Sequence, residues 1–126
     1  MKDKQEEIDA INIQLIALLI SLTSVIISII ITYNQKLDLE GINTVNPKKI
    51  FDLTIFNRLL ILVLSLIFLY VNYKLYKISK KEGEDLKPYI LQLIASILTI
   101  IASIIAIYIV SLSTKENIVD VENPII

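Results

Sequence analysis

Three long apolar stretches without a charged residue constrain this chain more than any other feature of its sequence. They run over Ile11–Tyr33, Leu59–Tyr73 and Tyr89–Leu112, and the middle stretch continues past Lys74 to about Tyr76. A helix needs about 20 mostly apolar residues to cross the roughly 30 Å hydrocarbon core of a bilayer. Each stretch is apolar all round rather than along one face, which disfavours a water-soluble bundle. We therefore predict an all-α integral membrane protein whose three transmembrane helices form an up-down-up bundle.

The composition narrows the class of protein in the same direction. The chain has 126 residues, of which 55% are hydrophobic, and a formal net charge of −1. A domain of this size cannot bury so much apolar surface away from water, so we expect the lipid bilayer to be its surroundings. The charge gives no bias toward nucleic acid, which we do not expect as a partner. Frequent Ile, Lys and Asn are typical of AT-rich bacterial genomes, so we predict a multi-pass protein of the bacterial cytoplasmic membrane.

The absence of Cys and His limits the chemistry of the chain. Thiolates, imidazole ligands and the usual proton shuttle at neutral pH are all missing. No carboxylate lies deep within a span, where proton or ion pathways would place one, and no Gly-rich phosphate loop or nucleophile with a base can be assembled. We expect no enzyme, no catalytic residue, no metal or cofactor site, and no small-molecule substrate.

The boundaries follow from the apolar stretches and the residues that flank them. We predict an N-terminal tail over residues 1–10, which could continue the first helix, then spans over 11–33, 54–78 and 88–112, connections over 34–53 and 79–87, and a C-terminal tail over 113–126. In the second connection Gly83 is expected to stop a helix and Asp85 to cap the next one, with Pro88 in its first turn. In the first connection Asn46 and Pro47 predict a helix start. Residues 47–53 then form either an interfacial helix or an early start of the second span, and both interpretations remain open.

The Lys and Arg residues near the span ends predict the orientation. One side has Lys2, Lys4, Lys74, Lys77, Lys80, Lys81 and Lys87, whereas the other has Lys36, Lys48, Lys49, Arg58 and Lys115. Because the richer side is usually cytoplasmic, we predict that the N-terminus and the 79–87 loop face inward and the C-terminus faces outward. We expect lipid headgroup contacts at Arg58, Lys74, Lys77, Lys80 and Lys81. Docking of an acidic partner is the alternative role of the lysines.

A stripe of small and polar residues recurs in the first and third spans at alternating steps of three and four. Association of helices in lipid depends on such residues, because apolar side chains gain little by leaving the lipid tails. We therefore predict that the first and third helices, which run parallel, pack through this small-residue seam, with a hydrogen bond between Gln14 and Gln92. The seam comprises Gln14, Ala17, Ser21, Ser24 and Ser28 in the first span and Gln92, Ala95, Thr99, Ala102 and Ala106 in the third.

Ser96 and Ser103 form a second edge on the third span, which we expect to face a further neighbour. That neighbour is either the middle span, where Asn57, Ser65 and Asn72 fall within one helical face, or another subunit.

Three classes of function are consistent with these features. The first is an interaction or accessory subunit that associates through small-residue helix faces, as a homo-oligomer or with another membrane protein. The second is a homo-oligomeric pore of holin or toxin type, with a lumen lined by Ser and Thr. The third is an immunity- or defence-associated membrane protein, which shares the architecture of the first and cannot be separated from it by sequence. We favour the first class, because Ala and Ile interrupt the hydroxyl stripe that a pore would need.

Overall fold

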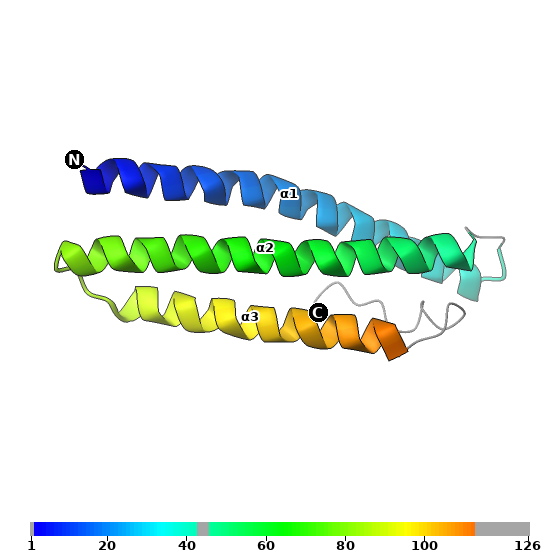
Figure 1. Cartoon of the computed structure of the whole chain (residues 1–126). Helices are drawn as coiled ribbons and strands as arrows, with labels where there is room; N and C mark the ends of the chain where they lie inside the picture. Colours follow the sequence, from blue (N-terminus) through cyan, green and yellow to red (C-terminus); the bar gives the residue numbers. More distant parts are fainter. Residues whose placement is uncertain (1, 43–45, 113–126) are drawn as a thin grey trace.

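Three long helices make up the chain in the computed structural model, which describes residues 2–42 and 46–112 (Figure 1). They are α1 (Lys2–Leu39), α2 (Pro47–Lys81) and α3 (Lys87–Leu112). Each is long and apolar enough to cross a membrane. The predicted all-α, three-span architecture is confirmed. The predicted tail over 113–126 lies outside the described residues.

The middle helix lies between the other two. α1 and α3 run in the same direction and α2 runs against both, as predicted for an up-down-up bundle (Figure 1). The extensive contacts are those of α1 with α2 and of α2 with α3. The first and third helices were predicted to pack on each other through the seam. That part of the prediction is wrong, because each of them packs mainly on α2. Short connections bring consecutive helices together as antiparallel neighbours, and here both outer helices pack on α2.

The helices are longer than the apolar stretches that define the spans. α1 has 38 residues and α2 has 35. At 1.5 Å per residue they are about 57 and 52 Å long, so both project beyond a hydrocarbon core of roughly 30 Å. Residues 47–53 belong to α2 without a break, so the structure has the continuous helix rather than a separate interfacial one.

The helix ends follow from the local signals in the sequence. The Asn46 side chain accepts a hydrogen bond from the Lys48 N–H at 2.8 Å, and Pro47 is the first residue of α2. At the other end of α2, Gly83 has φ +72°, and the Glu84 N–H donates to the Ser79 carbonyl at 3.1 Å. A residue with a Cβ would be strained in this left-handed conformation, which is why glycine ends the helix here.

Residues of all three helices form an apolar cluster at one end of the bundle. Ile31 of α1, Ile50 of α2 and Val110 of α3 form one buried cluster, against which Phe51 also packs. Large apolar side chains point outward along all three helices. This distribution is expected of a bundle whose outer surface contacts lipid.

Candidate functional site

Asn57 is a polar residue that joins α2 to α1. Its side chain is completely buried, at 0% exposure. The Ser24 hydroxyl donates a hydrogen bond to its Oδ1 at 2.7 Å, and its Nδ2 donates to the Ser28 hydroxyl at 2.9 Å. Both functional groups of the amide are thereby bonded to α1, which removes the cost of burying them.

Polar contacts also join α2 to α3. The Asn72 Nδ2 donates a hydrogen bond to the Ser96 hydroxyl at 2.6 Å, and the hydroxyl oxygens of Ser65 and Ser103 lie 3.3 Å apart. Each of these two hydroxyls also donates to a carbonyl of its own helix. Because a hydroxyl has only one proton, the Ser65–Ser103 contact competes with those bonds and is the weaker of the two.

These contacts decide which neighbour the edge of Ser96 and Ser103 faces. The sequence left two possible neighbours, the middle span or another subunit. In the structure this edge contacts the middle helix, α2. The prediction that Asn57 shares this contact with Ser65 and Asn72 is wrong, since Asn57 bonds to α1.

The two halves of the predicted seam have different surroundings. In α1, Ala17, Ser24 and Ser28 are buried and Gln14 and Ser21 are half-buried. In α3, Ala106 is buried. The remaining seam residues of α3 are exposed: Gln92, Ala95, Thr99 and Ala102.

The hydrogen bond expected between Gln14 and Gln92 is absent from the described residues. α1 and α3 lie on different sides of α2 at that end of the bundle (Figure 1).

A groove separates the two halves of the seam over the middle of the bundle. It has a volume of about 360 Å³ and is lined by residues of all three helices. Ser21 and Ser24 of α1 lie on one side, Thr99 and Ala102 of α3 on the other, and Phe68 of α2 also lines it. Seam residues of α1 and α3 that were predicted to contact each other therefore line the same groove instead.

Arg58 differs from the expected position of a lipid-facing anchor. Its side chain is only 3% exposed, so it is buried within the protein. The sequence places it near a span end, where an exposed arginine would extend to the headgroups. Arg58 instead lies on α2, the central helix. Because α1 and α3 both pack on α2, side chains of α2 are buried that would be exposed on an outer helix.

The four lysines predicted to contact headgroups all lie in the last two turns of α2 or just before them. Lys77, Lys80 and Lys81 are exposed and Lys74 is half-buried. Their contact with lipid remains a prediction.

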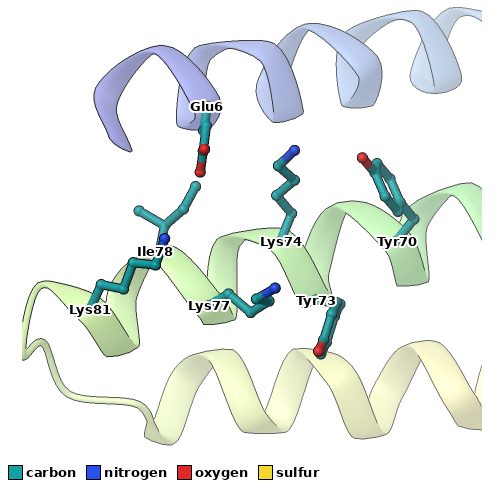
Figure 2. A pocket seen from close by; sticks show the side chains of 7 residues that line it. All are labelled: Glu6, Tyr70, Tyr73, Lys74, Lys77, Ile78 and Lys81. Atoms are coloured by element: carbon teal, nitrogen blue, oxygen red, sulfur yellow. The ribbon is translucent and has the colours of Figure 1, made fainter. Parts of the chain in front are cut away.

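A pocket lies between the start of α1 and the end of α2 (Figure 2). This boundary pocket has a volume of about 270 Å³ and is lined by Glu6, Tyr70, Tyr73, Lys74, Lys77, Ile78 and Lys81. Figure 2 shows Glu6 pointing from α1 toward α2, whereas Lys74 and Tyr70 point from α2 toward α1.

Two lysines of the boundary pocket are held by tyrosine rings. The Lys74 ammonium lies 5.9 Å from the centroid of the Tyr70 ring, and the Lys77 ammonium lies 5.6 Å from that of Tyr73. These distances are within the range of cation–π attraction. Sequence reasoning missed the pocket because nothing in the N-terminal tail indicates that Glu6 faces α2. The spacing of Tyr70, Lys74, Lys77 and Lys81, at steps of four and three, was the available signal.

The fold and these surfaces define the class: a small three-span membrane protein whose central helix is hydrogen-bonded to both neighbours. Comparison with protein-family models, with curated proteins and with solved structures finds no match for this chain.

Proposed function

We propose that this protein is an interaction or accessory subunit that associates, through the groove and the exposed seam of α3, with a transmembrane helix of a second copy or of another membrane protein. The observation that carries the proposal is the exposure of Gln92, Ala95, Thr99 and Ala102 on a helix that already packs on α2 by its other edge. Small residues let a second helix approach closely, and polar ones can bond to it.

The groove supports the same proposal. A helix that entered it would contact Ser21 of α1 and Thr99 of α3 together, and Phe68 of α2 would contribute apolar surface. The Ser21 and Thr99 hydroxyls donate to carbonyls of their own helices, at 2.9 Å in both cases. Their oxygens can therefore accept a bond from a partner without leaving an unsatisfied proton.

The pore alternative has less support from this arrangement. A lumen lined by hydroxyls needs them turned toward water, but those of Ser24, Ser28 and Ser96 bond to asparagines of α2. A pore would have to use the fewer hydroxyl groups of the α3 seam, where Thr99 is flanked by Ala95 and Ala102.

We propose that the protein has no enzymatic activity, because the chain lacks Cys and His. We also propose the bacterial cytoplasmic membrane as its location, with the N-terminus inside.

Copurification of two differently tagged copies, and of any stoichiometric membrane partner, tests the proposal. Combining Thr99→Leu with Ala102→Leu adds bulk to the α3 seam and should weaken association by about tenfold or more, equivalent to roughly 1.4 kcal/mol. The matched control combines Ile97→Phe with Ile104→Phe, which adds bulk at exposed positions on the opposite side of α3 and should leave association unchanged. Recovery of the wild-type chain as a lone monomer, or equal association of both variants, would contradict the proposal.

A further inference from the structure

The geometry points to a binding site for a phosphate group in the boundary pocket, which Lys74, Lys77 and Lys81 of α2 line together with Glu6 of α1. The chemical class of ligand is an anionic phosphate ester, as in the headgroup of an anionic phospholipid. This inference is independent of the proposed helix association, which uses other residues at another depth.

The charge of the boundary pocket favours an anion. Three lysines line it against one carboxylate, that of Glu6. Among the described residues, neither Lys74 nor Lys77 forms an ion pair, and the pair between Lys36 and Glu40 lies at the far end of α1. The ammonium groups of Lys74 and Lys77 are therefore available to an added anion.

The tyrosines reduce the cost of binding. A lysine side chain is flexible, and a ligand that immobilises it loses part of the binding free energy to ordering. Tyr70 and Tyr73 already hold the Lys74 and Lys77 ammonium groups over their rings. A phosphate would bind to cations that are partly in position.

The size and depth of the pocket fit a headgroup. Its volume of about 270 Å³ leaves room for more than a single water molecule. This is enough for a phosphate and the start of its ester. The pocket begins at Tyr70, inside the charge-free stretch that ends at Tyr73, and extends to Lys81. Tyrosines at such a transition mark the headgroup level of a membrane, where the phosphates of lipids lie.

Replacing Glu6 provides a second test, in which phosphate binding should become stronger instead of weaker. Its carboxylate is half-buried in the same pocket and repels an anion bound there. Glu6→Gln removes this repulsion and should strengthen phosphate binding. An unfolded variant could not produce such a gain.

Native mass spectrometry of the full chain in a neutral detergent tests the inference, because orientation in a membrane does not matter there. The probes are short-chain phosphatidylglycerol, short-chain phosphatidylcholine and glycerol 3-phosphate. We expect phosphatidylglycerol to bind more tightly than phosphatidylcholine. Lys74→Gln and Lys77→Gln should each weaken that binding about fivefold, the factor that corresponds to about 1 kcal/mol for a lysine near an anionic surface. Glu6→Gln should strengthen it by a similar factor.

The matched control is Lys48→Gln with Lys49→Gln, two exposed lysines at the opposite end of the same helix. It should leave binding unchanged. Binding of phosphatidylglycerol without glycerol 3-phosphate would assign the site to a lipid headgroup, and binding of both would show that the phosphate group alone suffices. Equal binding of the two lipids, an equal loss in the control, or weaker binding by Glu6→Gln would overturn the inference.

Discussion

Asn57 shows how one side chain can join two helices where the hydrophobic effect offers little. In lipid, an apolar residue at this position would gain almost nothing by facing α1 instead of the lipid tails. The amide of Asn57 both accepts and donates, and it bonds to hydroxyls one turn apart on α1. A residue that makes both bonds also fixes the depth of α1 relative to α2, because sliding either helix would break them.

We predict that Asn57→Leu destabilises the bundle by about 1 kcal/mol, since interhelical bonds in membranes are worth about 0.6 kcal/mol each. The loss stays small because the two serines can bond instead to their own backbone, as Ser21 does to the Ala17 carbonyl at 2.9 Å. Unfolding in a denaturing detergent measures the change. Asn12→Leu, at an exposed position of α1, is the control. Equal stability of the two variants would contradict the role of Asn57.

At the scale of the helices, the spans were predictable and the pairing was not. The spans follow from stretches without charge, and the caps from Asn46 and Gly83, because these signals depend only on residues nearby in the chain. Pairing depends on which edge of α3 faces which helix. Ser96 and Thr99 lie on adjacent edges and both carry hydroxyls, so their residue types do not say which edge faces α2. The short connections favour packing between helices that are consecutive in the chain, so α3 packs on α2. The similarity between the two halves of the seam does not change this pairing.

The two edges of α3 should respond differently to added bulk. Ser103 is 3% exposed against α2, so Ser103→Leu should overpack that contact and destabilise the monomer by about 1–3 kcal/mol. Thr99→Leu places the same side chain on the exposed edge and should change the free energy of unfolding by less than about 0.5 kcal/mol. Thermal unfolding of both variants in detergent distinguishes the edges. Greater destabilisation by Thr99→Leu would contradict the observed pairing.

At the scale of the whole molecule, the bundle has two distinct ends. The end with the boundary pocket gathers lysines from α2 around the start of α1, whereas at the other end Ile31, Ile50 and Val110 close an apolar core. The sequence predicts which end is basic but not that Glu6 joins it, since α1 must first be placed against α2. The buried position of Arg58 was equally unpredictable, because it depends on α2 being central.

We predict that the lysine-rich end faces the cytoplasm. The chain has no Cys, so Lys81→Cys and Lys48→Cys each provide a single thiol, one at either end of α2. In intact cells a membrane-impermeant maleimide should label Lys48→Cys and leave Lys81→Cys unlabelled until the cells are opened. The reverse pattern would invert the proposed orientation.

Photo-crosslinking along α3 in native membranes tests whether this helix presents a second, unfilled packing edge to another helix. A photoreactive phenylalanine analogue would be incorporated at Ala95 or Ala102 on the exposed seam and, as controls, at Ile97 or Ile104 on the opposite side. We expect discrete protein adducts, from a second copy or another membrane protein, at the two seam positions and none at the controls. Adducts equally strong on both sides, or absent from the seam, would contradict it.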